Sequence, residues 1–213
     1  SDQQVIPIHK KMFEARLGRG MSDADMAFFS TMKADRIQPF IQWMYSGIVS
    51  PQEEWSFWEI RRHFGIGDKE FYLKNGPAGL RNDMEKLYRN EQSKDFAILS
   101  GDRRIPVDRM VLSARTTLFR NMFREVKDGS NQVRDYSGLS FEALKVFVNY
   151  LYTDRIDETN LNAEIIAELK NTYEFFLAER NESDPSNPSS FIRKLTEVEE
   201  KLKSRLQMQK KDY

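Results

Sequence analysis

The side chains best suited to acid–base chemistry in this chain are its two histidines, His9 and His63, because imidazole titrates near neutral pH. His9 precedes an apolar helical pattern, and no nucleophile is identified to pair with it, so we expect a structural role. His63 ends the run Arg61-Arg62-His63, which we expect to form an exposed, basic helix surface. The sequence has no cysteine, which excludes thiol nucleophiles, disulfides and cysteine-ligated zinc or iron–sulfur sites.

The glycine and carboxylate motifs are too incomplete to bind a cofactor or a metal ion. Gly18-Arg19-Gly20 and Gly65-Ile66-Gly67 lack the further glycine and lysine of a phosphate-binding loop. The carboxylates Asp23, Asp25 and Asp35 do not follow the spacing of a calcium loop. We therefore expect no catalytic residue, no metal ion and no cofactor, and we predict a protein that is not an enzyme.

Charge and hydropathy narrow the kinds of partner. The 213 residues include 33 basic and 33 acidic side chains, so the basic excess typical of nucleic-acid binding is missing. No apolar run approaches the ~20 residues of a membrane helix, so we expect no membrane association. The aromatic content of 12% predicts a folded chain. These features therefore favour neither nucleic acid nor a membrane as a partner.

Two tryptophans, Trp55 and Trp58, stand three residues apart and can share one helix face. They either cover the local core or anchor a partner, because tryptophan is enriched among residues that dominate binding energy.

The hydrophobic pattern predicts an α+β fold. Residues 95–99 and 103–107 have the composition of two strands, and Ser100-Gly101-Asp102 predicts a tight turn between them. A further short strand is predicted at 133–136. Helical spacing of apolar residues predicts helices at 80–88, 109–114, 118–123, 141–152 and 160–177.

Two segments recur in the same order, which indicates an internal repeat. Residues 5–16 (VIPIHKKMFEAR) are similar to residues 104–115 (RIPVDRMVLSAR), and residues 40–48 (FIQWMYSGI) are similar to residues 147–156 (FVNYLYTDRI). The first copy has no visible counterpart of strand 95–99. We therefore expect either a first copy that lacks this strand or a longer natural chain.

Residues 93–156 resemble a BTB/POZ domain. The resemblance rests on four motifs in order: Asp95-Phe96-Ala97-Ile98-Leu99, the run from Ile105 to Arg115, Leu118-Phe119-Arg120-Asn121-Met122-Phe123, and Tyr150-Leu151-Tyr152-Thr153-Asp154. The first copy matches at His9-Lys10 and at Trp43-Met44-Tyr45-Ser46-Gly47. At the position of the family's histidine the second copy has Asp108, and at the position of the family's glycine it has Asp154. These two replacements affect any function that depends on the family's usual dimer face near those residues.

The resemblance also implies a candidate surface for protein partners. Family members that recruit a cullin scaffold carry an apolar-x-Glu motif after the Met-Phe helix, and the corresponding residues here are Val126-Lys127-Asp128. A cullin-type surface would therefore consist of Met122, Phe123, Val126 and Asp128.

The chain ends in a polar, proline-containing linker at 181–190 and a predicted amphipathic helix at 191–213. This helix either packs on the body or pairs with a partner helix. Its apolar seam consists of Phe191, Leu195, Val198, Leu202 and Leu206.

Together these patterns predict two BTB-like units, each a small sheet with clustered helices, followed by the C-terminal helix. The first unit covers 1–90 without its N-terminal strand, and the second covers 93–180. The implied function is a scaffold or adaptor that assembles through BTB-like surfaces, as an intramolecular pseudo-dimer or a homo-oligomer. The alternatives are a substrate adaptor of a cullin-RING ubiquitin ligase and a subunit of a transcriptional or chromatin complex. We expect a cytoplasmic or nuclear location.

Overall fold

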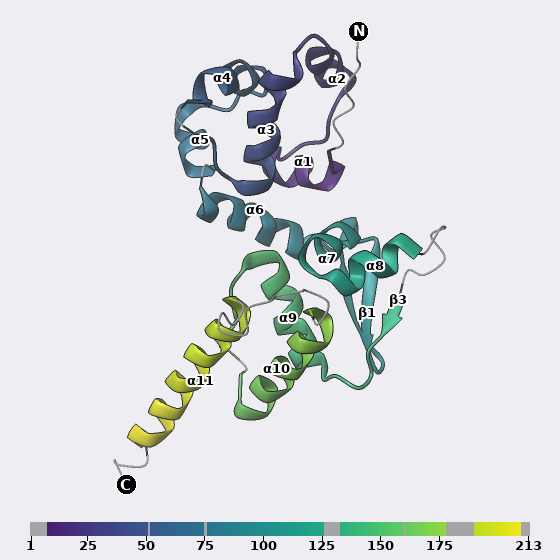
Figure 1. Ribbon diagram of the computed structural model, residues 1–213, viewed down its shortest axis with the longest axis vertical. Helices are drawn as coiled ribbons and strands as arrows, with labels where there is room; N and C mark the ends of the chain where they lie inside the picture. Colours follow the sequence, from purple (N-terminus) through teal and green to yellow (C-terminus); the bar gives the residue numbers. More distant parts are fainter. Residues whose placement is uncertain are drawn as a thin grey trace. The chain divides into compact units, whose positions relative to one another are not determined.

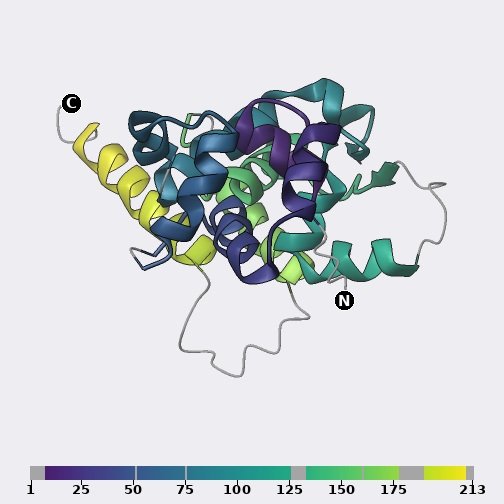
Figure 2. The same cartoon turned by 90° about the horizontal axis from the view of Figure 1, so that it is seen from above.

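The computed structural model describes residues 8–50, 52–74, 76–125, 133–159, 161–177 and 190–209, and Figures 1 and 2 show two views of it. The chain divides into two compact units, residues 1–89 and 90–213. Among the residues described, no helix combines the length and the apolar character that a membrane crossing requires.

In the described part of the first unit every regular element is a helix. Its helices are α1 (Lys10–Leu17), α2 (Asp23–Ser30), α3 (Ala34–Ser46), α4 (Glu54–His63), α5 (Asp68–Lys74) and α6 (Pro77–Arg89). Helix α3 packs against α1, α4 and α6.

An aromatic core holds the first unit together. Phe40, Trp43 and Met44 are fully buried on one face of α3, at the spacing that places side chains on one side of a helix. The Phe40 ring contacts those of Phe57 and Phe64, with centroids 6.0 and 5.8 Å apart. Apolar burial on this scale is the main force that holds a domain together.

The second unit contains a three-stranded sheet in the order β2-β1-β3; Figure 1 labels β1 and β3. Strands β1 (Phe96–Ser100) and β2 (Arg103–Val107) are antiparallel, with Phe96 opposite Val107 and Ser100 opposite Arg103. Gly101 has a φ of 58° in the two-residue loop, a conformation that tight hairpins require and glycine readily adopts. Strand β3 (Val133–Asp135) runs parallel to β1.

The helices of the second unit pack around α9 (Phe141–Thr153), whose neighbours include β1, β2 and the helices α7 (Arg109–Arg115) and α10 (Ala163–Leu177). Ser140 begins α9 because its side chain accepts a hydrogen bond from the Ala143 N–H at 3.2 Å. The remaining helices are the 3₁₀ turn η1 (Glu91–Ser93), α8 (Thr117–Glu125) and α11 (Ser190–Gln209).

The α+β class is confirmed, but the small sheet that we expected in each unit is seen only in the second; the described part of the first unit contains helices and no strand. Two boundaries also differ from expectation. Helix α10 starts at Ala163 rather than 160 because the Asn162 side chain caps it, accepting from the Ile165 N–H at 2.8 Å. Helix α6 starts at Pro77 because proline suits the first position of a helix.

Candidate partner-binding surfaces

A buried polar cluster in the second unit occupies the position where Asp108 replaces the family's histidine. Asp108 is 0% exposed, and its carboxylate accepts from the Lys94 ammonium and from the Tyr152 hydroxyl, both at 2.8 Å. The Tyr152 hydroxyl in turn accepts from the Asp108 N–H at 2.7 Å. Burial, followed by the nearby Asp108 carboxylate, raises the pKa of Tyr152 far above its usual value, so this hydroxyl remains a donor. The cluster joins the start of α7 to the end of α9 and is closed to solvent.

The first unit makes a corresponding contact at the residues that the repeat aligns with this cluster. The His9 N–H donates to the Tyr45 hydroxyl at 2.9 Å, and His9 Nδ1 lies 2.8 Å from the same oxygen. Helix α3 ends at Gly47 with a φ of 76°, as α9 ends at Asp154 with a φ of 55°. These contacts agree with the alignment of the two copies, and the tandem arrangement stays a prediction.

The same alignment pairs a cation with an aromatic ring in both units. The Arg16 guanidinium lies 4.0 Å from the Trp43 ring centroid, and that of Arg115 lies 5.8 Å from the Tyr150 ring centroid. In the first unit Arg16 is buried and also bonds Asp83 at 2.8 Å. Both pairs connect the helix that begins a copy, α1 or α7, to the helix that carries its second aligned segment, α3 or α9.

The residues of the predicted cullin-type surface lie at and beyond the end of α8. Met122 and Phe123 are half-buried. The Phe123 ring packs edge-on against Phe96 at 5.0 Å, and the Arg109 guanidinium lies 5.2 Å from its centroid. Phe123 therefore contributes to the packing of α8 on the sheet. Val126 and Asp128 lie outside the described residues.

The C-terminal helix packs against the second unit along its first three turns. Phe191, Leu195 and Val198 are buried, and Leu202 is half-buried. The ammonium of Lys170 on α10 binds the Glu199 carboxylate at 2.7 Å. Hydrogen bonds from Lys170 and Lys203 lower the pKa of Glu199 to about 2. Of the five predicted seam residues, the Leu206 side chain lies outside the description.

Of the two tryptophans proposed as anchors, the structure places the side chain of one. Trp58 is 49% exposed on α4, with the Arg62 guanidinium 5.5 Å from its ring centroid. Trp55 belongs to the same helix, and its side chain is outside the described set.

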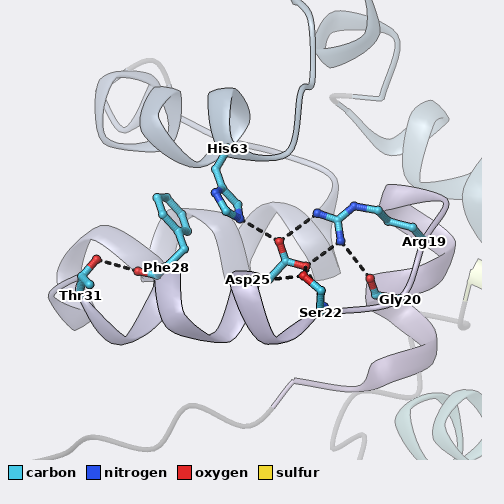
Figure 3. Close-up of polar contacts among 7 residues, drawn as sticks. All are labelled: Arg19, Gly20, Ser22, Asp25, Phe28, Thr31 and His63. Atoms are coloured by element: carbon cyan, nitrogen blue, oxygen red, sulfur yellow. Dashed lines mark hydrogen bonds and ion pairs between the residues drawn. The ribbon is translucent and has the colours of Figure 1, made fainter.

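Figure 3 shows a polar cluster that the sequence did not predict. The Asp25 carboxylate is 2% exposed and accepts two hydrogen bonds from Arg19, at 2.6 and 2.9 Å. Ser22 donates to it from its N–H and its hydroxyl, both at 2.8 Å, and His63 Nε2 donates at 2.8 Å. The expectation that His63 is exposed is wrong, because its ring stacks on Phe28 at 3.9 Å and its side chain is 24% exposed.

The cluster joins α2 to the end of α4, so its role in the first unit is structural. Ser22 followed by Asp25 is a capping box, a motif that could have been found from the spacing alone. The contact with His63 connects residues distant in sequence and leaves no local signal. Among the residues described, no group of histidines and carboxylates could hold a metal ion.

Replacing Asp25 with Asn is expected to lower the free energy of unfolding by about 1–3 kcal/mol at pH 7, because charge-assisted hydrogen bonds are lost. The hydrogen bond from Arg19, with those from Ser22 and His63, holds the Asp25 pKa well below its usual range. This contribution is therefore present above the unfolded pKa of about 3.9 and declines as the pH falls below it. Denaturation at pH 7 and at pH 3 gives the free energies of unfolding of the wild type and of Asp25→Asn. The difference between the two proteins should be smaller at pH 3. The matched control is Asp23→Asn, because Asp23 is exposed on the same helix. A difference in the free energy of unfolding between wild type and Asp25→Asn that increases as the pH falls would contradict the prediction.

Comparison with known proteins places the second unit in a family. The family model described as BTB/POZ domain matches residues 84–180. Human Kelch-like protein 5 is 30% identical over 100 residues, which cover 46% of this chain and 13% of that protein. Human Kelch repeat and BTB domain-containing protein 3 is 38% identical over 79 residues, or 35% of this chain and 12% of the relative. Zebrafish (Danio rerio) Kelch-like protein 24a is 31% identical over 81 residues, or 38% and 14%.

The aligned segments span only 12–14% of the length of these relatives. The matched residues include the hairpin, α7, α8, β3, α9 and α10, so the sequence likeness and the α+β architecture agree. The chain therefore contains a BTB/POZ domain, and almost all of that domain lies in the second unit.

Proposed function

We propose that this chain is a non-enzymatic scaffold or adaptor that associates with a second copy of itself through its BTB/POZ domain. The observation that carries the proposal is the edge that β3 forms in the sheet of the described residues. Strand β3 pairs with β1 on one side, and all three of its residues are exposed, with Val133 39% exposed. An exposed strand edge offers unpaired backbone groups that a strand of another chain can bind.

The opposite edge is less suited to this contact. Strand β2 carries Pro106, which has no N–H to donate, and exposed arginines at 103 and 104. Proline and charged side chains are the usual means by which proteins block edge-to-edge pairing. The two edges therefore differ: β2 carries a proline, whereas β3 carries none and exposes the apolar Val133 beside the charged Arg134 and Asp135.

Light scattering over a tenfold dilution series tests the proposal. The monomer mass is 25.1 kDa, and we expect a particle of about 50 kDa that dissociates on dilution. Val133→Lys should shift the equilibrium to the monomer, whereas Met208→Lys, on an exposed position of α11, should not. A particle of monomer mass at every concentration would contradict self-association and favour an intramolecular pseudo-dimer.

A substrate adaptor for a cullin scaffold is the second candidate. It is supported by the half-exposed Met122 and Phe123 at the end of α8, on a domain shared with the Kelch-like relatives. A second arm of the same experiment adds the N-terminal domain of a cullin at tens of micromolar. A heavier particle that Met122→Asp removes would support this function, and an unchanged mass would exclude it at that affinity.

A further inference from the structure

The first unit contains a cavity of about 570 Å³, within the size range of ligand-binding sites. Helices α1, α2 and α3 and the residues beside them form its walls. Its apolar lining includes Ile8, Phe13, Met26, Phe29 and Ile37, and Lys10 is its basic residue. Met26 is 58% exposed, so the lining reaches the surface.

The repeat alignment shows what occupies the corresponding place in the second unit. It pairs Ile8 with Val107 and Lys10 with Arg109, and the shared tyrosine contacts described above support this register. Val107 lies opposite Phe96 in the sheet, and the Arg109 guanidinium is 5.7 Å from the Phe96 ring centroid. In the BTB/POZ domain this place is therefore filled by strand β1.

Aligned residues are more deeply buried in the second unit than in the first, as expected if a strand covers them only in the second unit. Val107 and Leu144 are 0% exposed in the second unit. Ile8, the counterpart of Val107, is only half-buried in the first unit, and so is Ile37, which lies three residues before Phe40 as Leu144 lies three residues before Phe147. Covering such side chains with apolar groups is favourable, because it removes their surface from water.

The start of α1 also differs from the corresponding start of α7, and here the difference concerns charge. In the second unit the side chain of Asp95, directly before Phe96, accepts from the Arg109 N–H at 2.8 Å at the start of α7. Among the described residues of the first unit no side chain caps the start of α1, and the Lys10 side chain, whose ammonium lies 3.8 Å from the Glu14 carboxylate, is 80% exposed. A helix N-terminus and a lysine together attract a carboxylate. Asp23 also lines the cavity. A basic residue that precedes the carboxylate of a bound segment would complement the negative charge of Asp23.

We propose that this cavity binds an extended segment of a partner protein in which a basic and an acidic residue precede an aromatic and two aliphatic residues. Lys94-Asp95-Phe96-Ala97-Ile98-Leu99 is the example within this chain. The aromatic ring enters the apolar cavity, and the carboxylate lies at the start of α1 beside Lys10. The partner thereby supplies to the first unit the strand that β1 supplies to the second.

The experiment titrates the whole chain with the capped heptapeptide KDFAILS, the sequence of residues 94–100, by calorimetry. We expect saturable binding with a Kd below about 1 mM. Lys10→Glu and Met26→Glu should each weaken it by at least about fivefold, since both residues line the cavity and are exposed enough to leave the fold intact. Lys69→Glu, the same charge reversal at an exposed position of α5, is the matched control and should leave Kd unchanged.

Two peptide variants test the chemistry. Replacement of its phenylalanine by alanine, or of its aspartate by lysine, should abolish the heat of binding. The absence of saturable binding by the parent peptide would overturn the proposal. Binding that appears only after residues 1–7 are deleted would also overturn it, because the occupant would then be this chain's own N-terminal segment. These outcomes do not depend on self-association through β3.

Discussion

Replacing Lys94 with Met is expected to lower the free energy of unfolding of the second unit by about 3–5 kcal/mol, because it leaves the buried Asp108 carboxylate without its cation. The Lys94 and Asp108 side chains are 2% and 0% exposed, so water cannot take the place of the ammonium. The Tyr152 hydroxyl still donates to the carboxylate, but a hydroxyl carries no compensating charge. Breaking one side of a buried pair in this way costs far more than losing an ion pair at the surface.

A double variant separates charge from packing. Lys94→Met combined with Asp108→Asn removes both charges and keeps an acceptor for the Tyr152 hydroxyl, so it should be more stable than Lys94→Met alone. Lys145→Met, an exposed position on α9, is the control and should change stability by less than about 0.5 kcal/mol.

The measurement can report on each unit separately. All three tryptophans belong to the first unit, so tryptophan fluorescence follows its unfolding. Hydrogen exchange in the β1–β2 hairpin follows the second unit. We expect Lys94→Met to speed hydrogen exchange in the hairpin and to leave the midpoint of the tryptophan fluorescence transition unchanged. Exchange of the hairpin at the wild-type rate would contradict a stabilising role for the pair.

The parts of this fold that were predictable from sequence are those with a short-range cause. The hairpin was predicted because two runs of β-forming residues flank Gly101, and α9 because its apolar residues recur at helical spacing. The cap of α9 also has a short-range cause, because Ser140 directly precedes the helix. Each of these features depends on neighbours within a few residues.

The parts that were not predictable depend on pairs of residues far apart in the chain. His63 belongs to a basic run, so exposure was the natural expectation, yet its ring contacts Phe28 and Asp25 on another helix. Asp108 was noted as a departure from the family's histidine, but nothing local indicated that Lys94 would balance its charge. The internal repeat, which stays a prediction, rests on a different signal, because similarity between two segments indicates a long-range correspondence without a contact.

Replacing Phe191 with Ala is expected to lower the free energy of unfolding of the second unit by about 3–5 kcal/mol, the usual cost of deleting a buried phenylalanine side chain. Its ring is fully buried, with centroids 4.4 Å from Tyr150, 5.2 Å from Tyr173 and 5.7 Å from Phe147. Because these three rings belong to α9 and α10, the loss weakens the attachment of α11 to the unit.

The same substitution decides between the two roles predicted for the C-terminal helix. If α11 is part of the folded unit, Phe191→Ala should speed hydrogen exchange in α9, α10 and α11 together, because the helices share one core. If α11 mainly serves a partner, exchange in α9 and α10 should stay at the wild-type rate. Met208→Ala is the control, because Met208 is 62% exposed on the same helix and should change stability by less than about 0.5 kcal/mol. The burial of Phe191 and Leu195 favours the first outcome.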